Sequence, residues 1–306
     1  QRAEVQKSLY QAATDGDLPA PIRANLADLL DGVGLPRELE NDLYTFVSIV
    51  GRDAIPPYVI AKYPVTNAQY ARFLKPENFA SKDLWTGFPK YAEPEKLGDW
   101  GIEGWDWLQT ALKDEAFQEH NDVDFENGVI LPSYWRDARL GVMRPNAPVV
   151  GISWYEANAY CKWLLANWDE LDEGQQGLAK PIEIRLPLES EWEFAAGGDE
   201  YKRFAFGKLK DLKDQQRYAN MEGSGINRTT PVWMYPKGIS PAGVMDMSGN
   251  VWEWQANHRD KDRYTLRLPG GSWEFNHDAA RVSSRLKVDS DFRYYDIGFR
   301  VCALLS

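Results

Sequence analysis

The sequence predicts an α+β fold in which two main helices lie among short strands and long ordered loops. Residues 43–50 are rich in β-branched and aromatic side chains and end at Gly51, which indicates a strand. Residues 67–74 and 154–164 instead place apolar side chains at helical spacing. Because both periodicities occur along one chain, we expect a mixed domain.

Composition and charge argue against several classes of protein. The 306 residues are 43% hydrophobic and 13% aromatic, which suffices for a packed core. A net charge of −11 argues against binding to nucleic acid or to an anionic membrane surface. No apolar run approaches the roughly 18 residues of a membrane span, and the first residues lack the pattern of a signal peptide. Cys161 and Cys302 form neither a disulfide framework nor a zinc motif, so we expect a reducing, cytoplasmic compartment.

The first 42 residues differ from the rest of the chain in their hydrophobic pattern, which is helical throughout. Apolar residues recur there at helical spacing, Pro21 suits a first helical turn, and Gly32 or Gly34 suits a stop. This helical preface is either a docking arm or the tail of an upstream domain, and the start at Gln1 without Met suggests a piece of a longer or processed protein. Residues 43–306 are expected to form one domain with an insertion at about 75–130, a Trp-rich excursion that packs on the body or shapes a site.

Three helix starts carry capping signals. Thr66 or Asn67 caps the helix that follows, and Ser153 with Glu156 forms a capping box. Ser190 with Glu193 predicts another capping box, and Gly197 predicts the end of that helix. The acidic residues of 189–193 allow acid/base chemistry, but favourable negative charge at a helix start is the preferred interpretation.

A calcium site is one hypothesis for residues 243–254. Asn250 and Glu253 offer hard oxygen ligands close together, and Asn220, before a Gly-rich turn, offers another. The alternative is that Asn250 and Glu253 only satisfy turn amides, and the sequence leaves both open.

In the last forty residues, segments with clear structural signals lie on either side of a stretch without a regular hydrophobic period. Gly270 and Gly271 permit a tight backbone path, and residues 298–301 predict a closing strand. We expect Trp273 and Phe299 in the core, while the Tyr294–Tyr295 pair cannot both face inward on a strand. Aromatic and charged side chains between them predict a ligand-binding surface. Its candidate residues are Trp273, Phe275, His277, Asp278, Arg281, Arg285, Lys287, Phe292, Tyr294, Tyr295 and Asp296.

Several segments together resemble one family, the formylglycine-generating-enzyme or sulfatase-modifying-factor type of domain, a variant of the C-type lectin fold. The resemblance spans about residues 44–302 and leaves out 1–42 and most of 75–130. The matching segments are 63–67 (YPVTN), 148–154 (PVVGISW), 185–187 (RLP), 191–193 (EWE), 249–254 (GNVWEW), 270–273 (GGSW) and 298–300 (GFR).

The resemblance implies a fold more firmly than a reaction. Catalytic members use a copper-binding pair of cysteines in this last stretch, and aligning that motif on residues 281–285 places His277 and Val282 at the two positions. Another branch uses histidine-bound iron, but His120, His258 and His277 show no ligand spacing. A hydrolase triad of Ser272, His277 and Asp278 is disfavoured, because a triad depends on geometry and not on proximity in sequence.

A third branch keeps the fold without the chemistry. It includes the variable proteins of diversity-generating retroelements, which display diversified side chains on a fixed backbone. This chain resembles that branch. Most residues between Phe275 and Asp296 are of the types that such diversification exchanges for one another. Glu274 and Lys287 fit these types less well. We therefore expect a non-catalytic protein that binds a protein ligand, with no required cofactor beyond a possible structural calcium. The alternative is a metal-dependent oxidase.

Overall fold

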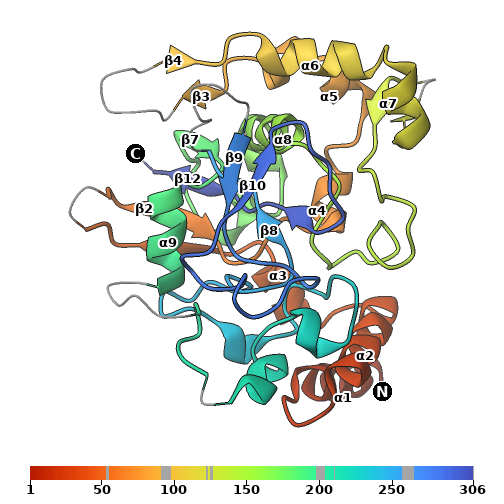
Figure 1. Ribbon diagram of the computed structural model, residues 1–306, viewed down its shortest axis with the longest axis vertical. Helices are drawn as coiled ribbons and strands as arrows, with labels where there is room; N and C mark the ends of the chain where they lie inside the picture. Colours follow the sequence, from red (N-terminus) through yellow and green to blue (C-terminus); the bar gives the residue numbers. More distant parts are fainter. Residues whose placement is uncertain are drawn as a thin grey trace.

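The computed structural model describes residues 1–306 except 53–54, 91–97, 122, 125–126, 198–203, 210, 257–264 and 306. Helices and short strands alternate along the chain, and long loops join them (Figure 1). The helices are α1 Arg2–Thr14, α2 Ala20–Val33, α3 Arg37–Asp42, α4 Asn67–Ala71, α5 Pro76–Ala80, α6 Glu103–Ala111, α7 Glu115–His120, α8 Trp154–Ala166 and α9 Glu189–Gly197. The strands are β1 Phe46–Ile49, β2 Tyr58–Ala61, β3 Pro89–Lys90, β4 Gly98–Asp99, β5 Val123–Asp124, β6 Val129–Ile130, β7 Glu183–Arg185, β8 Trp252–Glu253, β9 Thr265–Leu268, β10 Leu286–Asp289, β11 Ile297–Gly298 and β12 Cys302–Leu304.

The central sheet joins both ends of the domain. Its strands lie in the order β1-β2-β12-β7, and β12 pairs antiparallel with both β2 and β7. Cys302 lies opposite Ile60 on one side and Arg185 on the other. The predicted closing strand therefore starts later than expected, at Cys302, while residues 299–301 lead into it. Because the last strand is central to this sheet, the C-terminal segment is held from both sides.

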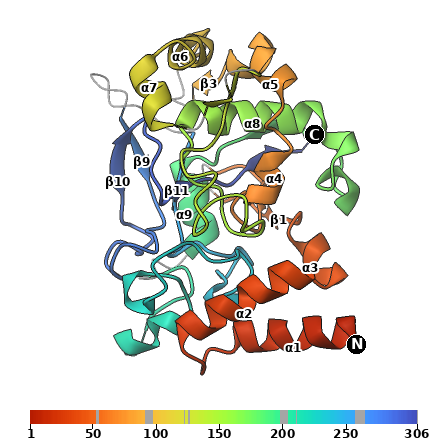
Figure 2. The same cartoon turned by 90° about the vertical axis from the view of Figure 1, so that its right-hand side faces the viewer.

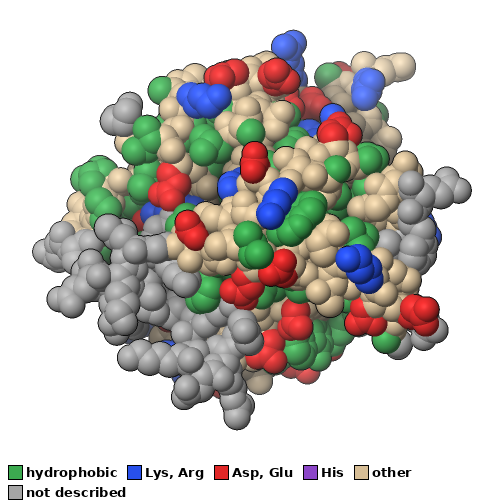
Figure 3. Space-filling view, turned by 90° about the horizontal axis from the view of Figure 1, so that it is seen from above, with side chains coloured by type: hydrophobic (Ala, Val, Ile, Leu, Met, Phe, Trp, Pro, Cys, Tyr) green, Lys and Arg blue, Asp and Glu red, His purple; other side chains and the backbone are tan. Residues whose placement is uncertain are grey.

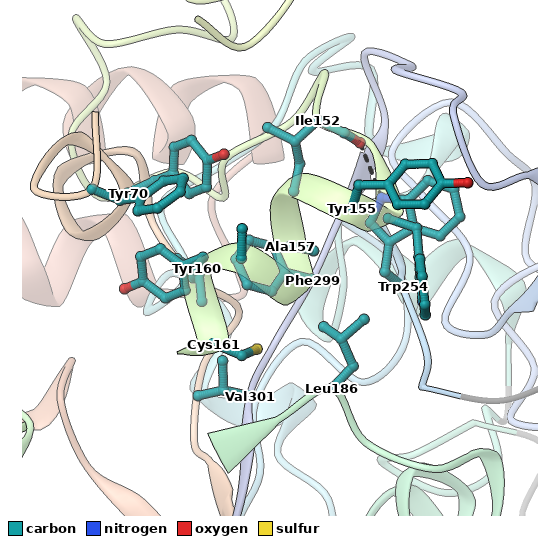
Figure 4. Packing of buried hydrophobic residues seen from close by; sticks show 14 of the residues in the cluster. Tyr70, Ile152, Tyr155, Ala157, Tyr160, Cys161, Leu186, Trp254, Phe299 and Val301 are labelled. Carbon is teal, nitrogen blue, oxygen red and sulfur yellow. Dashed lines mark hydrogen bonds between the residues drawn. The ribbon is translucent and has the colours of Figure 1, made fainter. Parts of the chain in front are cut away.

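The main core lies between this sheet and α8. The α8 face is almost wholly buried because Trp154, Tyr160 and Cys161 contact the sheet and the aromatic cluster around them. Figure 4 shows Tyr70, Tyr160 and Phe299 grouped beside α8, with Cys161 next to Val301. The rings of Tyr160 and Phe299 meet edge to face at 5.4 Å between centroids. Phe299 is fully buried, as expected, and the Trp254 indole donates a hydrogen bond to the Ile152 carbonyl.

The insertion covers the outer side of α8. Figures 1 and 2 place α5, α6 and α7 above α8, at the end of the molecule opposite α1 and α2. Its tryptophans provide the contact: Trp107 stacks between Trp85 and Tyr155, with ring centroids 6.1 and 5.3 Å apart. The prediction that this excursion packs on the body is confirmed.

The preface folds against the body. In the described chain α1 packs along α2, and α2 contacts the loops around residues 144 and 228 (Figure 2). Asp28 accepts hydrogen bonds from both Arg144 and Arg228, and Asp31 accepts one from Asn146 at 2.7 Å. Pro21 lies in the first turn of α2 and Gly34 ends it with φ of 93°, as predicted. These contacts join the preface to the body of the domain.

Two of the predicted helix caps are confirmed and one is wrong. Thr66 and Ser153 both form capping boxes. Ser190, by contrast, is inside α9, which begins at Glu189 and ends at Gly197. The carboxylate that bonds back to the backbone there belongs to Glu191, which accepts from the Leu188 amide at 2.8 Å. The helix begins two residues earlier than a cap at Ser190 would place it, because Glu191, and not Glu193, reaches the preceding turn.

Candidate functional site

A buried ion pair fixes the frame beneath the C-terminal segment. Arg300 and Glu253 are both 0% exposed and form two hydrogen bonds of 2.7 Å. The remaining Arg300 donors reach the carbonyls of Ala61, Lys62 and Met245, so the guanidinium ties β2 and the 245 turn to β8. A bidentate pair with satisfied donors holds one geometry, which makes this arrangement a rigid support.

The three predicted calcium ligands take part in protein hydrogen bonds. The Glu253 carboxylate accepts from Arg300 and from the Trp192 indole at 2.7 Å. The Asn250 side-chain oxygen accepts from the Thr230 amide at 2.9 Å, and that of Asn220 accepts from Ser224 at 2.9 Å. With their oxygens engaged and Glu253 neutralised by Arg300, the three do not converge on a cation. Asn250 instead holds a turn at φ of 67°, so the geometry corrects the calcium hypothesis in favour of its alternative.

Acidic residues of α9 also serve as partners for arginine. Glu191 forms a bidentate pair with Arg185, and Glu189 and Glu193 both bind Arg285. The acid/base hypothesis for this helix is therefore not supported. The prediction that Arg285 contacts a ligand is corrected as well, because its side chain is only 11% exposed and holds the C-terminal segment against α9.

Gly271 and Ser272 set the start of the displayed segment. Gly271 has φ of 71°, and a Cβ there would lie 2.7 Å from the Ala280 Cα, so only glycine fits without displacement. The Ser272 hydroxyl donates to the Asp296 carboxylate at 2.7 Å and not to His277, which removes the hydrolase triad. Asp296 is 2% exposed, so it lies beneath the surface and was wrongly predicted to be displayed.

Five aromatic rings form a continuous surface, called the aromatic surface below. Its members are Tyr134, Trp273, Phe292, Tyr294 and Tyr295. Tyr295 is at the centre, with ring centroids 5.7 Å from Trp273 and 5.8 Å from both Tyr134 and Tyr294. Phe292 stacks on Tyr294 at 5.2 Å, and these two rings are 38% and 43% exposed. Trp273 is half-buried and not a core residue, because it packs at the edge of a small cluster with Val150 and Val251.

The remaining predicted residues surround this surface unevenly. Phe275 is 37% exposed and meets Trp252 edge to face at 5.5 Å. Asp278 pairs with Arg281 at 2.5 Å and lies 3.3 Å from the half-buried His277. Lys287 is exposed on β10, which pairs with β9 as a hairpin beside α8 and α7 (Figure 2).

Sequence reasoning missed Tyr134 and Arg293. Arg293 is 4% exposed at its side chain and makes a bidentate pair with Glu156, and it also donates to Asn121 and to the Leu131 carbonyl. It thereby joins the insertion to the N-terminus of α8 directly beside Tyr294. Only the basic charge of Arg293 within an aromatic run signalled this role, and no local signal indicated Tyr134.

The described residues offer no reactive thiol and no evident metal centre. Cys161 and Cys302 are free and buried, and burial raises the pKa of both thiols far above the usual range. No group of three or more His, Cys, Asp or Glu that could hold a metal ion occurs in the described part of the chain. His258 lies outside the described residues. The same part contains no helix long and apolar enough to cross a membrane.

Comparison with known proteins identifies relatives of several kinds. The chain is 28% identical over 272 residues to the Inactive C-alpha-formylglycine-generating enzyme 2 of Bos taurus, covering 81% of this chain and 77% of that protein. It is 27% identical over 267 residues to the Hercynine oxygenase of Mycobacterium tuberculosis, covering 80% of this chain and 50% of that protein. Among solved structures, Treponema denticola variable protein 1 is similar at 18% identity, with a TM-score of 0.48, 85% of this chain covered and 91% of that chain.

The family itself follows from a match over most of the chain. Residues 50–304 match the family described as the sulfatase-modifying factor enzyme 1-like domain. The match begins after the preface and includes the insertion, the α8 core and the whole C-terminal segment. The chain therefore belongs to the FGE-sulfatase family, which is the family that the sequence motifs predicted.

Proposed function

We propose that this chain is a non-catalytic ligand-binding protein that uses the family fold as a frame for a surface on its C-terminal segment. The proposal depends on the two residues that the resemblance places at the family's cysteine positions, His277 and Val282. Val282 is 4% exposed and packs in the core, and His277 lies beside Asp278. Neither side chain forms a thiolate, and the chain's own two thiols are buried with a raised pKa.

The aromatic surface supports a binding role. Phe292 and Tyr294 expose rigid rings at low entropic cost, and Arg293 fixes the backbone between them through a buried pair with Glu156. Such a surface suits a protein ligand, while the net charge of −11 disfavours nucleic acid. One relative is itself named inactive, so a non-catalytic member would not be alone in the family. The two unpaired cysteines fit a reducing, cytoplasmic setting.

The competing function is a metal-dependent oxidase, because one relative is named an oxygenase. Metal analysis and oxygen consumption with a cysteine peptide distinguish the two. We expect neither copper nor iron to copurify in stoichiometric amount and no oxygen uptake above the background. About one metal ion per chain together with turnover of the thiol would overturn the non-catalytic proposal.

Binding itself is tested by selection from a protein display library on the immobilised chain. Selected binders should lose affinity about tenfold or more with Tyr294→Ser, because truncating a central aromatic ring removes a large contact. Leu29→Ser is the matched control, since Leu29 is an exposed apolar residue (58%) on α2. If Tyr294→Ser affects no selected binder, the aromatic surface is not the binding site.

A further inference from the structure

We propose that the aromatic surface receives a cationic side chain, arginine or lysine, presented by a segment of a protein partner. The cation would lie over the Tyr294 and Tyr295 rings, next to Glu274 and above Asp296. This inference rests on the proposed function and names the chemistry of the ligand that the same surface selects.

Three carboxylates near the aromatic surface, Glu274, Asp291 and Asp296, have no cationic partner among the described residues. Glu274 is exposed and accepts a hydrogen bond of 2.5 Å from the Tyr295 hydroxyl, and Asp296 accepts one from Ser272. Neither forms an ion pair with a described Lys, Arg or His, and the exposed Asp291 next to Phe292 forms none either. The surface therefore carries negative charge that nothing in the described chain balances.

The nearby cations are engaged elsewhere. Arg293 is paired with Glu156, Arg285 with Glu189 and Glu193, and Arg281 with Asp278. Lys287 on β10 also has an interaction partner. Because each of these groups is already committed, the charge at Glu274 and Asp296 is left for an outside cation to neutralise.

The buried position of Asp296 strengthens the excess of negative charge at this surface. Burial raises the pKa of Asp296 to about 6, and the nearby Glu274 charge adds to that effect while the Ser272 hydroxyl opposes it. The carboxylate is nonetheless mostly ionised at neutral pH. A buried anion beside a second anion is stabilised by an arriving positive charge, and its field is screened less than that of an exposed carboxylate.

The rings favour an organic cation over a metal ion. Tyr294 presents an exposed ring that already stacks on Phe292, and a guanidinium or ammonium above such faces is attracted by their electron density. Arginine suits the arrangement best, because its plane stacks on a ring while its fork reaches a carboxylate. A metal ion would need convergent ligands, and the described residues offer no such group.

The experiment uses a random peptide library selected on the full chain at physiological salt and counter-selected on the Tyr294→Ser variant. Each enriched peptide is synthesised with its Arg residues intact and replaced by citrulline, which keeps shape and hydrogen bonding but removes the charge. Affinities are measured by calorimetry for the parent chain and for Glu274→Gln, which retains an acceptor for Tyr295. Glu38→Gln on α3 is the control, because α3 lies on the far side of the molecule from β10 (Figure 2).

We expect enriched peptides to carry Arg or Lys, and citrulline replacement to weaken binding about tenfold. Glu274→Gln should weaken the Arg peptide by a similar factor but leave the citrulline peptide unchanged, while Glu38→Gln changes neither. Enriched peptides that are neutral or acidic, yet still depend on Tyr294, would overturn the cation inference and leave the binding function intact. Failure to enrich any peptide that depends on Tyr294 would count against the proposed function itself.

The face of the molecule at the insertion end shows how charge is distributed away from the proposed site. In Figure 3 acidic and basic side chains are interspersed among apolar ones there, without a large area of one sign. A basic peptide could still be attracted non-specifically by the net negative charge of the whole chain. Measuring Glu274→Gln and Glu38→Gln in parallel distinguishes this general attraction from binding at the proposed site. Equal loss in both variants would indicate general charge attraction and refute the site.

Discussion

Replacing Arg300 with Met removes the cation at the centre of the frame. Arg300 and Glu253 are fully buried, and the guanidinium also serves the carbonyls of Ala61, Lys62 and Met245. Leaving a buried charge unpaired costs about 3–5 kcal/mol, and each carbonyl that loses its donor adds about 1 kcal/mol or less where water cannot replace it. We therefore expect Arg300→Met to lower the free energy of unfolding by about 4–6 kcal/mol.

Urea unfolding followed by tryptophan fluorescence measures this loss. Lys180→Met is the control, because its pair with Asp169 is 3.0 Å long but 47% and 71% exposed, and such pairs contribute under about 0.5 kcal/mol. If Arg300→Met does not fold, Trp192→Phe removes one donor from Glu253 and should cost about 1–3 kcal/mol. Losses below about 1 kcal/mol for Arg300→Met would refute the view that this pair supports the frame.

Four further predictions follow from the same geometry. Gly271→Ala should destabilise the chain by more than about 2 kcal/mol, through a positive φ and a 2.7 Å backbone contact, whereas Gly101→Ala, with φ of 55° in open space, should cost only about 1 kcal/mol in urea unfolding. Cys161 and Cys302 should resist a thiol reagent until urea unfolds the chain, and rapid labelling of the native protein would contradict their burial. A chelator should leave the melting temperature unchanged, because the predicted calcium ligands are taken by protein donors; a fall would restore the metal site. Burial raises the pKa of Asp246 to about 7, so the folded state binds the extra proton and this group's stabilisation is lost as pH rises through about 7. Its contribution changes by up to about 1.4 kcal/mol per pH unit between pH 4 and 7, and Asp246→Asn should flatten that slope in unfolding measured across this range.

The local signals in the sequence identified several elements correctly. Thr66 and Ser153 cap their helices because a capping box needs only residues three apart along the chain. Gly34 ends α2 with a φ of 93°, a conformation that glycine adopts without steric cost, so this signal is local as well. The ordered motifs predicted the family, and the residue matches at 249–254 and 298–300 correspond to Glu253 and Arg300 of the buried pair.

Charge partners were not predictable in the same way. Asn250, Glu253 and Asn220 resemble calcium ligands in sequence, but whether an oxygen is free depends on donors that arrive from Thr230, Arg300 and Ser224. Arg285 and Asp296 were expected on the displayed surface because they lie within the C-terminal segment of aromatic and charged residues, yet partners on other segments hold Arg285 against α9 and bury Asp296.

The sequence by itself determined the α+β class, the helix caps at Thr66 and Ser153, and the family, because each depends on residue identity or short-range spacing. Tertiary structure alone decided which side chains of the C-terminal segment reach solvent and which carboxylates lack a cation. Tyr134 meets Tyr295, and Arg293 joins the insertion to α8, through contacts between segments far apart in the chain. The burial of a side chain and its ion-pair partner depend on where distant segments pack. The periodicity of one segment therefore does not predict them.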